Sequence, residues 1–206
     1  EGSSVVLRIQ RASEASQREI SLVRRDIVVP SVEAVMLEGR LAYFRISEFK
    51  GNTTAEFDDA LRNLLPQKPI GLILDLRNNP GGLLTSAQET LGHFYIGPAL
   101  YEVDHQGQEK QLDTIPAASD VQIGDIPMVV LINANTASAS EIVAGALRDK
   151  RIHTILLGEK TFGKGSVQHI FPLKDSGNVR VTFAHWFTPN HTVIHGEGIS
   201  PDQLLV

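Results

Sequence analysis

The stretch GLILDLRNNPGGLL, residues 71–84, indicates the fold more clearly than any other part of this sequence. Its first six residues form a nearly continuous apolar run, which is typical of a strand buried on both faces of a parallel sheet. A second run of this kind, PMVVLIN, occupies residues 127–133. Helical spacing of apolar residues follows each run. Because strands alternate with helices, the sequence predicts an α/β fold with a mainly parallel sheet.

Further elements are predicted on both sides of these two runs. Strands are expected at residues 41–46 and 153–157, and helices at residues 54–65, 83–95 and 138–148. The chain is rich in strand-like segments from residue 167 to residue 196, which predicts an antiparallel flank. Residues 1–29 contain two short strands, which alone are rarely stable in water. A linker-like segment around Pro30 follows, so we expect residues 30–206 to form the main domain.

Composition excludes several classes of function. The chain has 206 residues, 42% of them apolar and 21% charged, which predicts a packed globular core. A net charge of −5 argues against nucleic acid as a partner, because phosphate binding requires clustered Lys and Arg. Cysteine is absent, which excludes disulfides, Cys-ligated zinc and a thiol nucleophile. The seven histidines form no HExxH pattern, so a metal site is not expected. A Ser–His–Asp arrangement stays open, because such triads assemble from residues distant in sequence.

The first candidate functional residue is Ser138, in the segment NANTASASEIVAGAL after the second apolar run. A serine at the start of a helix lies beside free N–H donors and the positive end of the helix dipole, which suits a nucleophile that generates an oxyanion. The same residue with Glu141 forms the pattern S-x-x-E, a capping box that many helices use only for stability. From this segment alone, both interpretations stay open.

Two further loops add candidate residues. Gly81 and Gly82 follow the first apolar run, and a glycine amide there, with the amide of Ala139, would suit an oxyanion hole. A simple tight turn explains the same glycines. The segment GEKTFGKGSVQ, residues 158–168, resembles a phosphate loop, but Gly165 stands where such a loop needs Ser or Thr, and a strand follows in place of a helix. Glycines on both sides of Lys164 allow a backbone that folds inward and carries the amine toward the sheet, where a buried lysine would suit a general base. A lone lysine between glycines is more often a solvated loop residue, so this interpretation also stays open.

Together these segments resemble the C-terminal processing peptidases, the tail-specific serine proteases of peptidase family S41. The matching stretches are FRISEF (44–49), GLILDLRNNPGGLL (71–84), TASASEIVAGAL (136–147), GEKTFGKGSVQ (158–168) and FTPN with IHGEGISPD (187–202). They are long, occur in the family's order and extend over most of residues 30–206. The resemblance implies a core like that of ClpP and crotonases, preceded by a PDZ module of which residues 1–29 are the C-terminal remnant.

The resemblance also implies roles for particular residues. Ser138 would be the nucleophile, Lys164 the base that activates it, and Gln168 the residue that orients the lysine. The oxyanion hole would consist of the amide of Ala139 and that of Gly81 or Gly82. No cofactor is needed for this chemistry.

The expected substrate is an unfolded or tail-exposed polypeptide, bound in extended form through its C-terminal region and cleaved nearby. The family implies a bacterial periplasm or cell envelope, or a thylakoid lumen, with membrane association through segments outside this sequence. A homo-oligomer or an adaptor protein is a further expected partner. Two alternatives stay open: a catalytically silent peptide-binding module of the same fold, and a crotonase-like acyl hydrolase or hydratase.

Overall fold

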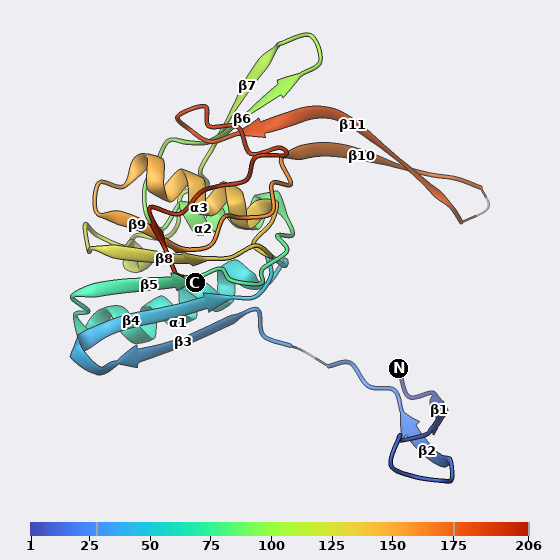
Figure 1. Ribbon diagram of the computed structural model, residues 1–206. Helices are drawn as coiled ribbons and strands as arrows, with labels where there is room; N and C mark the ends of the chain where they lie inside the picture. The colour runs from blue at the N-terminus through green and yellow to red at the C-terminus, as the bar shows by residue number, and fades with distance from the viewer. Residues whose placement is uncertain (28, 175, 206) are drawn as a thin grey trace. The chain divides into compact units, whose positions relative to one another are not determined.

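A six-stranded sheet dominates the computed structural model, which describes residues 1–27, 29–174 and 176–205 (Figure 1). The strand order is β12-β9-β8-β5-β4-β3. Neighbouring strands are parallel except β3 and β4, which pair antiparallel at one edge. The strands are β3 Val32–Leu37, β4 Leu41–Ile46, β5 Gly71–Asp75, β8 Met128–Ile132, β9 Thr154–Gly158 and β12 Gln203–Leu204. The predicted mainly parallel α/β sheet is therefore confirmed.

Three helices form the core with one face of this sheet. They are α1 Thr53–Leu64, α2 Leu84–Leu91 and α3 Ala139–Lys150, and short 3₁₀ helices lie at Glu38–Arg40, Leu65–Gln67 and Ser119–Val121. Strand β4 alternates between buried and half-buried residues, and its buried residues Ala42, Phe44 and Ile46 join one apolar cluster with side chains from all three helices. The other face of β4 carries Tyr43 and Arg45, which are only half-buried.

A second, antiparallel sheet forms the predicted flank. Its order is β10-β11-β6-β7, with β6 Pro98–Asp104, β7 Glu109–Asp113, β10 Ser166–Pro172 and β11 Asn178–Phe187. Strands β10 and β11 form a long hairpin that projects away from the helices (Figure 1). Strand β10 is an edge strand, and it begins two residues after Lys164.

Residues Glu1–Pro30 form a separate compact unit from Ser31–Val206. Within it, β1 Ser4–Ile9 pairs antiparallel with β2 Arg18–Val23. Several large apolar side chains of this pair are exposed, among them Val6, Leu7, Ile20, Leu22 and Val23. The two predicted strands are thus present, and their assignment to a PDZ remnant stays a prediction.

Two elements differ from the expectation. Helix α2 ends at Leu91, four residues before the predicted end at Tyr95. At Gly92 the chain approaches the carbonyl of Ile115 so closely that any side chain there would overlap it, and this contact redirects the backbone. Strand β3 lies just after the expected linker around Pro30, where no element was predicted, and its pairing with β4 completes the sheet edge.

Candidate active site

Ser138 lies at the junction of β8 and α3, where it is the N-cap of the helix. Its backbone has φ 59° and ψ −121°, whereas an ordinary N-cap residue is extended with negative φ. A residue other than glycine pays a conformational cost in such a region, and residues of this kind cluster at functional sites. The capping box of Ser138 with Glu141 forms, and the Ser138 amide donates to Oε2 of Glu141 over 2.8 Å. Ser138 therefore takes part in a capping box while its own backbone is in a strained conformation.

The glycine loop after β5 packs directly against this junction. A Cβ built on Gly81 would lie 2.7 Å from Cβ of Ser138 and 2.9 Å from the amide nitrogen of Ala139. Only glycine permits this approach, and its φ of +102° also favours glycine. Asn79 is fully buried and fixes the loop. Its side-chain amide donates to the backbone carbonyl of Ile46 over 2.8 Å, and its backbone carbonyl accepts the Ala137 amide over 3.0 Å.

The two glycine amides differ in their partners. The Gly81 amide donates to Oδ1 of Asn79 over 2.9 Å. Gly82 forms a parallel bridge with Phe49 through its neighbours, since the Gly81 carbonyl accepts the Phe49 amide and Leu83 donates to the Phe49 carbonyl. Among the described residues, the amides of Gly82 and Ala139 have no hydrogen-bond acceptor. Gly82 is exposed, so its N–H is accessible to a ligand, whereas Ala139 is fully buried in this conformation.

Lys164 and Ser138 are connected through their backbone amides, which donate to the same carboxylate oxygen. The Lys164 amide donates to Oε2 of Glu141 over 2.8 Å, and the same oxygen accepts the Ser138 amide over 2.8 Å. The two backbone nitrogens therefore lie no more than twice that distance apart. The structure thus brings together two residues separated by 26 positions in the sequence.

Lys164 is exposed as a solvated loop lysine would be, and its amine is not buried as the general-base interpretation required. The amine forms no hydrogen bond or ion pair with any residue that the structure describes. The flanking glycines serve a different purpose, because Cβ atoms at Gly163 and Gly165 would lie 3.0 and 2.5 Å from the backbone of Gly198 and His195. Both glycines are buried against that segment, and Lys164 between them is turned to solvent.

The side chain of Gln168 makes its hydrogen bond within the β10–β11 hairpin. Its side chain is exposed on β10, and its amide donates to Oγ1 of Thr182 on β11 over 3.2 Å. Strand β10 has a register irregularity between Val167 and Gln168. Gln168 and the lysine amine form no hydrogen bond among the described residues, and the role of Gln168 in orienting Lys164 stays a prediction.

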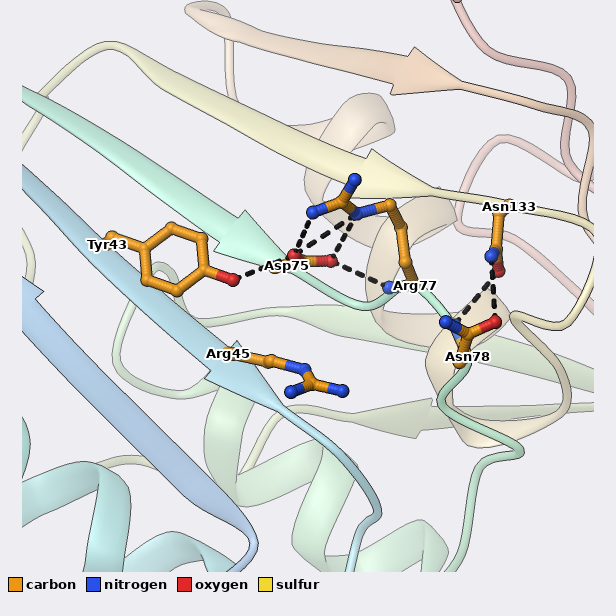
Figure 2. A pocket seen from close by; sticks show the side chains of 6 residues that line it. All are labelled: Tyr43, Arg45, Asp75, Arg77, Asn78 and Asn133. Carbon is orange, nitrogen blue, oxygen red and sulfur yellow. Dashed lines mark hydrogen bonds and ion pairs between the residues drawn. The ribbon is translucent and has the colours of Figure 1, made fainter. Parts of the chain in front are cut away.

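A polar pocket of about 350 Å³ lies at the carboxyl ends of the parallel strands (Figure 2). Its lining includes Tyr43, Arg45, Asp75 and Arg77. Asp75 is buried and accepts the Tyr43 hydroxyl over 2.8 Å and two guanidinium nitrogens of Arg77, the shorter bond being 2.6 Å. Burial acts to raise the pKa of the Asp75 carboxyl, but the hydrogen bonds from Arg77 and Tyr43 outweigh it and hold that pKa below its usual value.

The same pocket contains the link between the two loops. The backbone amide of Asn78 donates to Oδ1 of Asn133 over 2.9 Å. In return, the side-chain Nδ2 of Asn133 donates to the side-chain Oδ1 of Asn78 over 2.9 Å (Figure 2). Asn135 also donates to Asn78 over 2.9 Å. The chain leaving β5 is therefore tied to the chain leaving β8 just before the glycines and Ser138.

Sequence reasoning singled out the two loops but missed the buried carboxylates behind them. Asp75 ends an apolar run and is followed two positions later by Arg77, a pattern that marks a charge at a strand end. Glu141 was interpreted only as part of a capping box, because the hydrogen-bond donors that it accepts from residues 161–164 are distant in sequence. No sequence pattern relates Tyr43 to Asp75, since they meet only across neighbouring strands.

Metal-binding clusters and membrane-spanning helices are both absent from the described residues. No three His, Asp or Glu side chains gather there in a metal-binding arrangement. None of the helices in those ranges is both long and apolar enough to cross a membrane.

Comparisons with known proteins place the chain in a family. A family model described as "Peptidase family S41" matches residues 40–205. The chain is 40% identical over 209 residues to the carboxyl-terminal-processing protease of Synechocystis sp., with 98% of this chain and 48% of that protein covered. It is 36% identical over 205 residues to the carboxy-terminal processing protease CtpB of Bacillus subtilis, with coverages of 97% and 42%. The chain therefore belongs to peptidase family S41.

Solved structures agree with this assignment. The fold matches that of the photosystem II D1 C-terminal processing protease with a TM-score of 0.76 and 32% sequence identity, over 99% of this chain and 56% of the other. The chain spans about half the length of the curated relatives that it matches.

Proposed function

We propose that this chain carries the catalytic core of a serine endopeptidase of the C-terminal processing type, with Ser138 as nucleophile and Lys164 as general base. The observation that carries the proposal is the convergence at Ser138. A serine in a strained backbone conformation lies against Gly81, beside two free amides, and its own amide shares an acceptor atom with that of Lys164. A serine that only caps a helix needs none of these features.

The proposed reaction begins when the neutral Lys164 amine takes the proton from Oγ of Ser138 as that oxygen attacks the peptide carbonyl. The amides of Ala139 and Gly82 then hold the oxyanion, because the Gly81 amide already donates to Asn79. Collapse of the intermediate breaks the C–N bond, and Lys164 gives its proton to the leaving amine. Water then attacks the acyl-enzyme and Lys164 accepts its proton. As the acyl C–O bond breaks, Lys164 returns that proton to Oγ of Ser138, which releases the new carboxyl terminus and restores both residues.

The exposed Lys164 amine has to turn toward Ser138 for this chemistry. The backbone amides of Lys164 and Ser138 already share one acceptor atom, so the proposed movement is a rotation about the side-chain bonds of Lys164. A substrate that covers the site would remove the amine from water, which disfavours the charged ammonium and favours the neutral base.

The proposed substrate is an unfolded or tail-exposed polypeptide, held in extended form through its C-terminal region and cut nearby. Strand β10 offers an unpaired edge two residues after Lys164, and an extended chain can add to such an edge through main-chain hydrogen bonds. This mode tolerates varied substrate sequences.

The wider setting is proposed from the family alone. We assign residues 1–29 to the remnant of a PDZ-like module and the core to the ClpP and crotonase type. We place the protein in a bacterial cell envelope or a thylakoid lumen. A second copy of the chain or an adaptor protein is its proposed partner.

Cleavage of unfolded casein tests the proposal. The chain is compared with Ser138→Ala and Lys164→Ala, and with two controls at exposed positions of the same residue types, Ser200→Ala and Lys160→Ala. We expect the unsubstituted chain and both controls to cut, and the two active-site variants to be inactive. Cleavage by Ser138→Ala would contradict the nucleophile, and binding of casein without cleavage by any variant would favour the silent peptide-binding module.

A further inference from the structure

Glu141 is an unusual carboxylate for a helix cap. It lies in the first turn of α3 and is 0% exposed, whereas the glutamate of a capping box is ordinarily at the surface. No Lys, Arg or His of the described residues forms an ion pair with it. Burial of an unpaired charge is costly unless hydrogen bonds and dipoles compensate it. Stabilising the helix end does not require that burial.

Four hydrogen-bond donors surround this carboxylate. Oε2 accepts the amides of Ser138 and Lys164, each over 2.8 Å. Oε1 accepts the Gly163 amide over 2.6 Å and the Thr161 hydroxyl over 2.5 Å. The N-terminus of α3 adds a favourable dipole. The charge is thus balanced entirely by groups from two places, the start of α3 and the loop 161–164.

The arrangement connects the nucleophile to the base. Ser138 belongs to the chain leaving β8, and Lys164 belongs to the chain leaving β9. Their backbones share one acceptor atom, so any movement of the lysine loop away from the helix breaks a charge-assisted hydrogen bond. Thr161 extends the connection, because its Oγ1 also accepts the Ile199 amide over 2.7 Å.

We propose that Glu141 is a positioning residue for the peptidase reaction, whose carboxylate fixes the separation between the Ser138 nucleophile and the Lys164 base. The proposal rests on the proposed function of Ser138 and Lys164. Glu141 acts through backbone amides and exchanges no proton with substrate. Its effect is on the placement of the two catalytic residues and therefore on the rate of the chemical step, with little effect on substrate affinity.

Glu141→Gln is the primary variant. Gln retains the shape of the side chain but replaces one oxygen with an NH₂ group, so two of the four donors lose their acceptor whichever way the amide turns. Glu56→Gln is the matched control. Glu56 also accepts four hydrogen bonds: its Oε2 accepts the backbone amides of Ser31 and Val32 and the Ser31 hydroxyl, and its Oε1 accepts the side-chain amide of Asn52.

Three measurements on the full chain and each variant separate positioning from stability. We expect kcat for a casein-derived peptide to fall about 10²-fold in Glu141→Gln with KM nearly unchanged, because a misplacement of about 1 Å costs that much. Hydrogen exchange at the Gly163 and Lys164 amides should rise in this variant. Glu56→Gln should show a comparable loss of thermal stability with kcat and the exchange at Gly163 and Lys164 unchanged.

Thr161 provides the graded test. Thr161→Val removes one donor from Oε1 and should lower kcat less than Glu141→Gln, since both amides on Oε2 keep their acceptor. Thr161→Ser retains the hydroxyl and should restore kcat.

Two results would overturn the proposal for Glu141. One is a folded Glu141→Gln chain with wild-type kcat. The other is equal protection of the Gly163 and Lys164 amides in that variant and in the unsubstituted chain. If the unsubstituted chain cleaves nothing, the proposed function itself fails. Hydrogen exchange at these amides then still decides whether Glu141 holds the loop: raised exchange in Glu141→Gln means that it does, and unchanged exchange means that it does not.

Discussion

Gly81 packs so closely against Ser138 that there is no room for a side chain on the glycine. A Cβ built at Gly81 would lie 2.7 Å from Cβ of Ser138, and the backbone there has φ +102°. The glycine loop therefore defines one wall of the site and limits where the serine can lie.

Gly81→Ala should reduce casein cleavage about 10²-fold or more, because the new methyl group displaces Ser138 and the neighbouring Ala139 amide. The positive φ adds about 1–2 kcal/mol of strain for a residue with a Cβ. Gly107→Ala separates the two effects, since Gly107 has φ +76° and a Cβ added there would meet nothing within 4 Å. That control should lose stability by a similar strain and retain full activity. Equal activity of both variants would contradict the contact as a determinant of the site.

Lys164→Arg should be as inactive as Lys164→Ala. Arginine preserves the positive charge and the length of the side chain, but it is not deprotonated in proteins and therefore cannot accept the serine proton. Substantial cleavage by the arginine variant would mean that position 164 supplies charge only. The measurement is kcat/KM for a casein-derived peptide from pH 6 to pH 10.

Arg77→Gln should make the free energy of unfolding less dependent on pH in the acid range. Burial raises the pKa of Asp75, yet hydrogen bonds from Arg77 and Tyr43 lower it overall. A carboxyl with a depressed folded pKa contributes stability above its unfolded pKa of about 3.9, and this is lost as pH falls through the folded value. We expect the variant to lose about 1–3 kcal/mol at pH 7, with Arg77 half-exposed and partly screened.

Urea unfolding at a series of pH values measures this effect. The difference between the two proteins should shrink as the pH falls from about 4 through the lower folded pKa of Asp75 in the unsubstituted chain, because below that pKa Asp75 is protonated in both proteins. A difference that stays constant down to pH 2 would show that Arg77 stabilises the fold by packing and not through Asp75.

Arg151→Met should destabilise the fold without changing the chemistry. Arg151 follows α3, is 9% exposed and donates to the carbonyls of Phe94, Gly124 and Ile126 at 3.4, 3.2 and 2.9 Å. Its loss leaves those acceptors unpaired, at a cost of about 2–4 kcal/mol in the free energy of unfolding. Circular dichroism on heating measures the loss, and kcat below the transition should be unchanged. A selective fall in kcat would link this region to the site.

The sequence predicted the elements whose signal is local. The apolar runs before Arg77 and Asn133 indicated β5 and β8, and the helix after Ser138 begins where its capping pattern indicates. Strand β3 was missed because most of its side chains are exposed, so its sequence lacks a buried run, and only its pairing with β4 defines it.

The site was predicted in its loops and not in its tertiary contacts. The glycines beside Lys164 were interpreted as a means of burying the amine, but they allow close packing against the segment around Gly198. The role of Glu141 depends on partners 20 or more residues away, which the capping pattern does not reveal. Periodicity identifies elements and loops, whereas contacts between loops follow from the arrangement of the whole sheet.

The most direct test of the Ser138–Lys164 assignment is mass-spectrometric mapping of the adduct formed by a fluorophosphonate probe, which reacts with activated serines. The unsubstituted chain, Lys164→Arg and Lys160→Ala are incubated with the probe and digested, and the labelled peptide is sequenced as a function of time. We expect one adduct, on Ser138, that forms at the same rate in Lys160→Ala as in the unsubstituted chain and much more slowly in Lys164→Arg. An adduct on another serine, or an equal rate in Lys164→Arg, would contradict it.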